Sequence, residues 1–342
     1  MPTLELKVPG KIAGHVDAID ELRGFAILVI ILYHAGGVLV WQNFFHGDIG
    51  VDIFVLLSGV GIALSTRVET AGQFLRRRLL RIYPAYWIVL TVFLLANILL
   101  LHLPYTPFNI AVHYLGIQGL FGDAIGFSID DSFWFITLIV GWYVVYAVLR
   151  GRFSRPDHVV LWGGILSAVV AYAYFESGQA GCFGHIGLRF PGFFAGLLIG
   201  MLLRDGRLEI ALSPALAAGL FAAIYVPYTH GIIFAPGVVA FALAIGYLFF
   251  WRVKAQGELV GTVARDLRFL GKYSLEIFLI HQPLIRDYNI YVLARVFDDP
   301  SPSQFALIVG MAVALAVTLF ASAQLHRLLG RLLFARAAAP AG

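Results

Sequence analysis

Charged residues and cysteine are both scarce in this sequence. The chain has 342 residues, of which 13% are charged and one, Cys182, is a cysteine. A soluble globular protein is about 25% charged, so this composition excludes an ordinary soluble enzyme, a disordered chain and a fibrous protein. A single cysteine excludes an intramolecular disulfide and a cysteine-rich metal site. The net charge is only +4. We expect no nucleic-acid partner and no metal cofactor.

Apolar residues are correspondingly abundant in the sequence. They make up 60% of the chain, and the mean hydropathy is +0.85. Because a membrane-spanning helix needs about 20 mostly apolar residues, the composition suffices for roughly ten spans. We predict an all-α integral membrane protein of the cell (inner) membrane, with one ten-helix bundle domain over 1–342. The expected spans are 24–43, 49–66, 82–103, 133–149, 159–175, 188–203, 210–228, 232–251, 274–294 and 305–325.

Lysine and arginine indicate how these spans are oriented. They gather before span 1, between spans 2 and 3, 4 and 5, 6 and 7, and 8 and 9, and after span 10. Ten spans place all these segments on one side, and basic loops are typical of the cytoplasmic side. We therefore expect both termini in the cytoplasm. The N-terminus shows no signal peptide, so the first apolar run is expected to be retained. The segment 104–131 is expected to lie outside, as a re-entrant or interfacial segment that does not cross.

Two histidines, His34 and His281, lie deep in predicted spans. A polar group in hydrocarbon often marks a functional site, although a hydrogen bond between helices would also explain either one. Arg23 lies eleven residues before His34, which places the two on nearly the same helix face about 16 Å apart. Asp20 is close enough to pair with Arg23. Since imidazole suits proton transfer near neutral pH, this face is a candidate catalytic site.

The densest basic cluster is the run Phe74-Leu-Arg-Arg-Arg-Leu-Leu-Arg-Ile-Tyr-Pro84. A helix would bring Arg77 and Arg78 close to Arg81, and guanidinium forks match phosphate oxygens bidentately. The run therefore predicts a clamp for a phosphorylated donor, or else a basic loop that binds lipid head groups. We expect Pro84 in the first turn of the third span.

Further polar groups occur in the second and ninth spans. Asp52 lies near a membrane edge and needs a partner, while Ser58 and Gly59 fit either a site or helix packing. Glu276 and His281 are five residues apart, about 140° around a helix, so we expect separate partners for them.

The sixth span carries Gly192, Gly196 and Gly200 at four-residue spacing, which indicates close helix packing. The chain has no internal repeat of the kind found in many transporters. Residue chemistry alone thus leaves two functions open. One is an enzyme that uses a phosphorylated donor, and the other is a proton-coupled transporter or flippase for a glycan or lipid intermediate.

Four motifs together resemble the membrane acyltransferase 3 family. They are Ile19-Asp-Glu-Leu-Arg-Gly-Phe-Ala26 followed by His34, Gly50-Val-Asp-Ile-Phe-Val-Leu-Leu-Ser-Gly59, Phe74-Leu-Arg-Arg-Arg-Leu-Leu-Arg-Ile-Tyr-Pro-Ala-Tyr-Trp87, and the run from Ser274 to Pro283. The resemblance covers about 15–330 in the family's order. It implies a ten-span O-acyltransferase that moves an acyl group, most often acetyl from acetyl-CoA, to a hydroxyl of a sugar, glycan or related small-molecule acceptor.

The resemblance also assigns roles to residues. His34 matches the family's proposed catalytic histidine, and Arg23, which pairs with Asp20, matches its essential companion. Arg78 and Arg81 match the basic signature that handles CoA in the family. With them we expect Arg77 and Tyr83 to bind acyl-CoA. Asp52, Ser58, Trp134 and His281 match further signature positions without a defined role, and Glu276 is one more candidate site residue. Polysaccharide-modifying members carry two acids where this chain has Ile139 and Val140, so the acceptor stays open.

Overall fold

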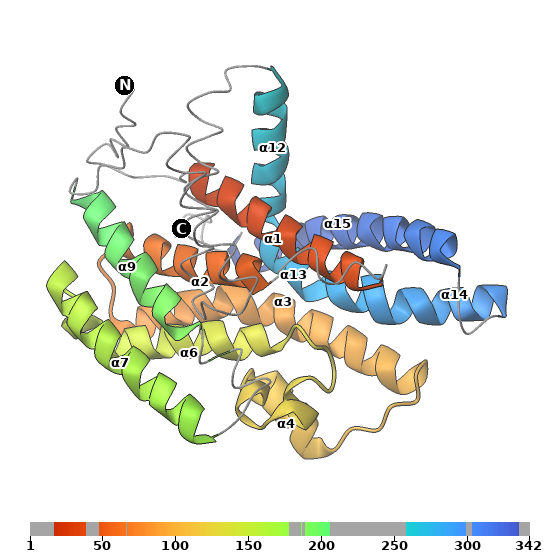
Figure 1. Cartoon of the computed structure of the whole chain (residues 1–342), viewed down its shortest axis with the longest axis horizontal. Helices are drawn as coiled ribbons and strands as arrows, with labels where there is room; N and C mark the ends of the chain where they lie inside the picture. Colours follow the sequence, from red (N-terminus) through yellow and green to blue (C-terminus); the bar gives the residue numbers. More distant parts are fainter. Residues whose placement is uncertain are drawn as a thin grey trace, which may run out of the picture. The chain divides into compact units, whose positions relative to one another are not determined.

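The computed structural model describes residues 17–38, 48–65, 67–177, 186, 189–205, 258–298 and 303–334. In these ranges the chain forms helices and connecting turns without a strand, so the all-α prediction is confirmed for them (Figure 1). The helices are α1 (Asp17–Val38), α2 (Asp48–Ala63), α3 (Ala71–Leu99), α4 (Pro107–Leu115), η1 (Gln118–Leu120), α5 (Asp123–Gly126), α6 (Trp134–Leu149), η2 (Arg150–Arg152), α7 (Pro156–Ser177), α9 (Phe190–Arg204), α12 (Glu258–Lys272), α13 (Ser274–Pro283), η3 (Leu284–Tyr288), α14 (Asn289–Phe297) and α15 (Gln304–Phe334).

Several helices are suited to a membrane. Four of the described helices are long and apolar enough to cross it, namely Ile19–Val38, Ala71–Leu99, Trp134–Arg152 and Gln304–Leu332. Three shorter apolar helices coincide with predicted spans 2, 5 and 6, namely Ile49–Ala63, Pro156–Val170 and Pro191–Arg204. Predicted spans 7 and 8, over 210–228 and 232–251, lie outside the described residues. The structure therefore supports a multi-pass membrane protein, while the count of ten and the orientation of the termini stay predictions.

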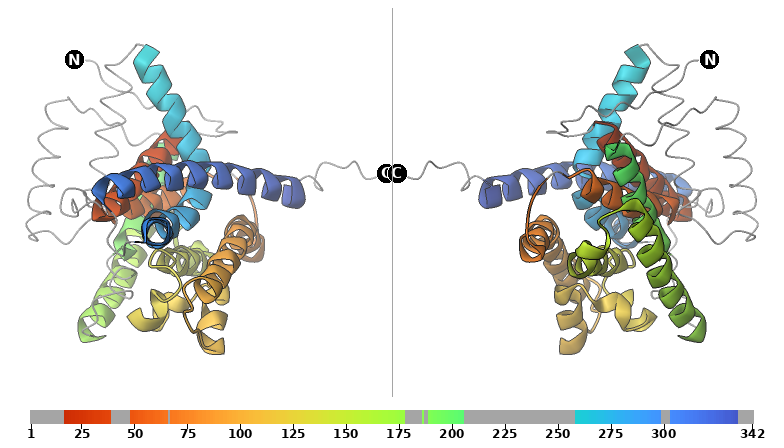
Figure 2. Two further views of the ribbon diagram at one scale, coloured as in Figure 1. Left: turned by 90° about the vertical axis from the view of Figure 1, so that its right-hand side faces the viewer. Right: turned by 90° about the vertical axis from the view of Figure 1, so that its left-hand side faces the viewer.

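The chain divides into two compact units, and the first comprises Met1–Ile30, Asp48–Phe74 and Gly141–Lys272. In it, α9 packs along α2 and against α7 (Figure 2). Glycine makes the approach to α2 so close that a Cβ at Gly196 would lie 2.0 Å from the carbonyl oxygen of Leu56. A Cβ at Gly59 would lie 2.2 Å from the carbonyl oxygen of Phe193. The packing predicted from the glycine spacing is confirmed.

Helix α12 was expected to be a basic connecting segment, yet it is an ordered helix that packs on the N-terminal part of α1. A Cβ at Gly24 would lie 1.9 Å from the Leu267 carbonyl oxygen. Arg268 of α12 also forms an ion pair of 2.8 Å with Glu21. These contacts satisfy the acidic start of α1, which explains why the helix begins at Asp17 rather than near the predicted residue 24. His34 therefore lies nearer the C-terminal end of this helix than its middle.

The prediction that Pro84 lies in the first turn of the third helix is wrong. Helix α3 begins at Ala71, so Pro84 is inside it. The start is set by a capping box, in which the Gln73 amide nitrogen donates to Thr70 Oγ1 over 3.2 Å and the Thr70 amide donates to Gln73 Oε1 over 2.8 Å. Such a box satisfies two of the free amides at a helix start. The basic run is consequently helical, as the clamp hypothesis requires.

The second unit comprises Ile31–Gly47, Leu75–Val140 and Tyr273–Gly342. Three aromatic side chains of α3 hold α4 by its C-terminal carbonyls: Tyr83 to Leu115, Tyr86 to His113 and Trp87 to Tyr114, over 2.6–2.8 Å. These bonds satisfy carbonyls that a helix end leaves free. With nine residues, α4 is about 13 Å long and too short to cross a bilayer. This agrees with the expectation that 104–131 does not cross.

Predicted span 9 is helical from Ser274 to Phe297, but in three pieces. Between α13 and α14 lies η3, a π-helical segment that follows directly on Pro283. Proline lacks the amide hydrogen that an α-helix needs, and π segments occur frequently at functional sites. Arg286 and Asp287 lie within η3.

Candidate active site

The structure brings together the two histidines that the sequence placed inside spans. His34 of α1 is half-buried and His281 of α13 is fully buried. Their ring centroids lie 5.1 Å apart with an interplanar angle of 58°. Both belong to the second unit. The two imidazole rings are therefore in contact, although no hydrogen bond joins these two described residues in the structure.

Backbone contacts determine which nitrogen of His281 carries hydrogen. Its Nδ1 lies 2.8 Å from the carbonyl oxygen of Phe278 and 3.1 Å from that of Ile277. A carbonyl oxygen only accepts, so Nδ1 is the donor, and Nε2 of the neutral ring keeps its lone pair. This Nε2 is buried and has no hydrogen-bond partner among the residues that the structure describes. His281 therefore presents an acceptor.

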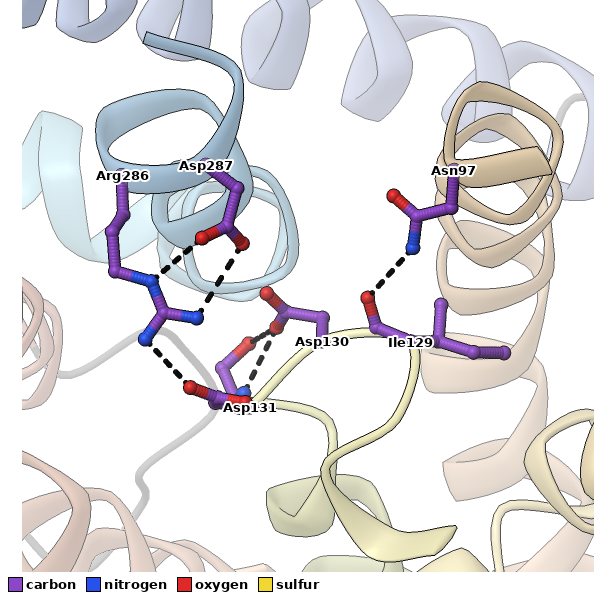
Figure 3. A network of polar contacts seen from close by, with 7 residues as sticks. Asn97, Ile129, Asp130, Asp131, Arg286 and Asp287 are labelled. Carbon is purple, nitrogen blue, oxygen red and sulfur yellow. Dashed lines mark hydrogen bonds and ion pairs between the residues drawn. The ribbon is translucent and has the colours of Figure 1, made fainter. Parts of the chain in front are cut away.

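A charged group around Arg286 lies in η3, the segment that directly follows α13. Arg286 donates from Nη1 to Asp131 over 2.6 Å and from Nε to Asp287 over 2.7 Å. Figure 3 shows the guanidinium between the two carboxylates. Arg286 lies five residues beyond His281, so the ion-pair group follows the histidine pair within about 7–8 Å along the helical axis.

Asp130 adds a third carboxyl beside this group. It is 2% exposed, and its Oδ1 accepts from the amide and the hydroxyl of Ser132. Its Oδ2 has no hydrogen-bond partner in the described part of the chain, and it points toward Arg286 and Asp287 (Figure 3). Burial, with the neighbouring carboxylates of Asp131 and Asp287, raises the pKa of Asp130 to about 7 despite the bonds from Ser132.

Glu276 has a partner of its own, as expected from its spacing to His281. Its Oε1 lies 2.8 Å from Nδ1 of His326 on α15. Glu276, His281 and Arg286 follow one another at five-residue steps, about 7–8 Å apart along the axis. The stretch α13–η3 thus carries an acid–histidine pair, a histidine pair and an arginine–carboxylate group in sequence.

The predicted donor-binding arginines also lie in the second unit. Arg77 and Arg78 are half-buried and Arg81 is exposed on α3, and the helix brings Arg81 close to both. Tyr83 uses its hydroxyl to hold α4, over 2.6 Å to Leu115. Its position suits packing rather than a direct hydrogen bond to a ligand.

The remaining predicted residues lie in the first unit, except Trp134, which is buried at the start of α6. Asp20 pairs with Arg23 over 3.3 Å, as expected. Asp52 finds its required partner in Arg189, over 3.2 Å, and both side chains are buried. Ser58 is half-buried on α2.

Sequence reasoning missed several members of these groups. Arg189 and His326 are partners of acids that had been recognised, but they lie 137 and 50 residues away from them. Asp130 and Asp131 form an acidic pair just before the fourth predicted span. We predicted only that their segment, 104–131, does not cross the membrane, and assigned no role to the pair. In the described ranges no cluster of three or more His, Cys, Asp or Glu side chains could hold a metal ion.

Comparison with known proteins agrees with the resemblance of the motifs. A family model described as an acyltransferase domain matches residues 16–321. The chain is 30% identical over 231 residues to a protein of Komagataeibacter xylinus provisionally named membrane-bound transacylase BcsY, which covers 59% of the chain and 58% of that protein. It is 27% identical over 160 residues to a protein of Acidianus two-tailed virus provisionally named acetyltransferase ORF330, covering 46% of the chain and 47% of the relative.

A third relative is the peptidoglycan O-acetyltransferase OatA of Listeria monocytogenes. The two are 32% identical over 130 residues, which is 36% of this chain and 18% of OatA. The chain thus spans less than two thirds of each of these relatives. No solved structure matches it. Because the family model extends over nearly the whole chain, the chain belongs to the acyltransferase 3 family, and its described helices include several that are apolar enough to cross a bilayer.

Proposed function

We propose that this protein is an O-acyltransferase of the cell membrane. It transfers an acyl group, most simply acetyl, from acetyl-CoA to a hydroxyl of a sugar, glycan or related acceptor. The observation that carries the proposal is the His34–His281 pair, with centroids 5.1 Å apart, in a chain of the acyltransferase family. The names of the relatives, a transacylase and two acetyltransferases, support acetyl as the group transferred.

His34 is the general base of this reaction. It takes the proton of the acceptor hydroxyl while the hydroxyl oxygen attacks the carbonyl carbon of the thioester. The carbon–sulfur bond then breaks, so that the acyl group becomes an ester of the acceptor. The CoA sulfur leaves with the bonding electrons and recovers the proton from the His34 imidazolium. Such base catalysis accelerates a reaction about 10²–10⁴-fold.

His281 orients this base. Its lone pair at Nε2 accepts a hydrogen bond from one nitrogen of His34 after a small rotation of that side chain. The other nitrogen of His34 is then the unprotonated one and is free to take the acceptor's proton, because the bond made at one ring nitrogen determines the protonation of the other. His281 is thus a positioning residue.

The arginines of α3 bind the donor. Arg78 and Arg81, with Arg77, hold the phosphates of CoA, since guanidinium matches phosphate oxygens bidentately. In the ten-span topology with cytoplasmic termini, this end of α3 faces the cytoplasm, where acetyl-CoA is found. Arg23, which helix geometry places on nearly the same face of α1 as His34, is the proposed companion of the base.

The test compares His34→Gln with His34→Ala in purified protein, supplied with acetyl-CoA and with glycerol or methyl glucoside as acceptor probes. Release of the CoA thiol and formation of the acetyl ester are measured, together with CoA binding. We expect both variants to lose about 100-fold or more in turnover while CoA binding persists. Glutamine keeps the size and hydrogen bonding of histidine but takes up no proton.

His158→Gln is the matched control, because it removes a half-exposed histidine of α7 in the first unit. Turnover near that of the wild type in His34→Gln would remove His34 from the role of base. A wild type that releases no CoA would overturn acetyl-CoA as the donor.

A further inference from the structure

The loop that carries Asp130 is held firmly at one end of the second unit. Asn97 near the end of α3 donates to the Ile129 carbonyl over 3.1 Å (Figure 3). Asn97 itself accepts from the Tyr288 hydroxyl over 2.7 Å, and Tyr105 donates to Ser128 over 3.2 Å. The position of the Asp130 carboxyl is therefore fixed by its surroundings rather than by a ligand.

The loop has more carboxyl groups than arginines beside it. Arg286 donates to Asp131 and Asp287, and no hydrogen bond among the described residues joins it to Asp130. Three carboxyls thus share one guanidinium. The side chains of the ion-pair group are 36–41% exposed, whereas Asp130 is buried beside them. A buried polar oxygen without a partner is costly, so Oδ2 of Asp130 is a place where a ligand gains affinity by supplying one.

We propose that Oδ2 of Asp130, together with the Asp131–Arg286–Asp287 group, is the docking point for a hydroxyl of the acyl acceptor. This inference rests on the proposed function and names the part of the protein that recognises the acceptor. A hydroxyl both donates and accepts, which suits a carboxyl that is able to do the same near neutral pH. Arg286 and the two exposed carboxylates supply further donors and acceptors for neighbouring hydroxyls of a polyhydroxy compound.

The location fits an acceptor rather than a donor. Asn97 and Arg78 lie nineteen residues apart on α3, about 28 Å along the axis, which is close to the thickness of a bilayer core. The Asp130 loop is therefore anchored at the end of α3 opposite the arginines proposed to bind CoA. Arg286 is also only five residues beyond His281, the partner of the proposed base. An acceptor docked here would reach His34 without competing for the phosphate site.

The experiment measures how the acetyl group divides between water and an added hydroxyl compound. Wild-type protein, Asp130→Asn and Asp130→Ala are incubated with acetyl-CoA and increasing glycerol, methyl glucoside or N-acetylglucosamine. Acetyl ester and free acetate are quantified, and CoA binding is measured separately. Asparagine keeps an oxygen for Ser132 but places an amide, a donor only, where Oδ2 was.

We expect Asp130→Asn to raise the acceptor KM and lower the ratio of ester to acetate by about tenfold or more, since a buried polar group that loses its hydrogen-bond partner costs that much binding. CoA binding and the hydrolysis rate without acceptor should stay within about twofold. The matched control Asp123→Asn removes an exposed carboxyl from the same connecting segment and should keep the wild-type ratio.

An unchanged ratio in both Asp130 variants would overturn the docking point. So would a wild type that hydrolyses acetyl-CoA yet acetylates none of the probes. Either result leaves the proposed donor chemistry intact. Loss of CoA release in the wild type would instead contradict the proposed function itself, so the two failures are distinguishable.

Discussion

The buried carboxyl of Asp130 makes the stability of the protein depend on pH in an unusual direction. Burial raises the pKa of this group from an ordinary 3.8 to about 7, so the folded protein binds the proton more tightly than the unfolded chain. The contribution of this carboxyl to stability is therefore full below about pH 4, falls as the pH rises toward 7, and is lost above it. At 1.36 kcal/mol for each pKa unit, the loss amounts to about 4 kcal/mol.

Asp130→Asn removes this titration while it retains the oxygen that accepts from Ser132. Relative to the wild type, the variant should gain about 4 kcal/mol between pH 4 and pH 8, which is a relative increase of about 4–8 °C in Tm. Thermal unfolding in detergent micelles, followed by tryptophan fluorescence across this range, measures the difference, with Asp123→Asn as the control for loss of a charge. A constant difference between Asp130→Asn and wild type at every pH would refute the reasoning, because it would mean that the pKa of Asp130 is the same in the folded and the unfolded state.

Two further predictions follow from geometry. Gly196→Ala should lower Tm strongly or prevent insertion, because its Cβ would meet the Leu56 carbonyl oxygen at 2.0 Å. Gly192→Ala should be tolerated in the same thermal assay, because its Cβ would meet Val55 at an ordinary 3.7 Å. Equal stability of the two variants would contradict the packing argument. Arg81→Lys should raise the KM for acetyl-CoA because it loses the bidentate fork, and Arg81→Ala should raise it more; equal kinetics for both variants and wild type would make the basic run a topology signal only.

The sequence predicted the presence of the apolar helices more accurately than the residues at which they begin and end. Apolar runs were sufficient to locate the long apolar helices of the described residues, because a helix that crosses the bilayer needs a long, mostly apolar stretch. The start of α3 was misplaced although its capping box, Thr70 with Gln73, is legible in the sequence. Helix α12 was missed because its basic residues were interpreted as a loop signal. The period of a π segment such as η3 differs from that of an α-helix, so pattern reading across it fails.

The candidate site was foreseen in its parts but not in its pairings. The spacing of Asp20 to Arg23, and of Glu276 to His281, is local to one helix, and helix geometry decides it. The pairs Asp52–Arg189 and Glu276–His326 join distant helices, and the requirement for a partner does not identify which residue supplies it. The meeting of His34 with His281 depends equally on tertiary packing.

The π segment η3 has a consequence for how the part of the chain that follows it could change. One extra residue in a helical turn shifts the phase of everything that follows while the helix before it stays in register. In this chain that shift falls between His281 and α14, and Arg286 lies within it. A single-residue deletion there would rotate the arginine away from Asp131 by about 100° and leave the histidine pair where it is. Recognition and chemistry would thus occupy neighbouring but independently adjustable portions of one helix.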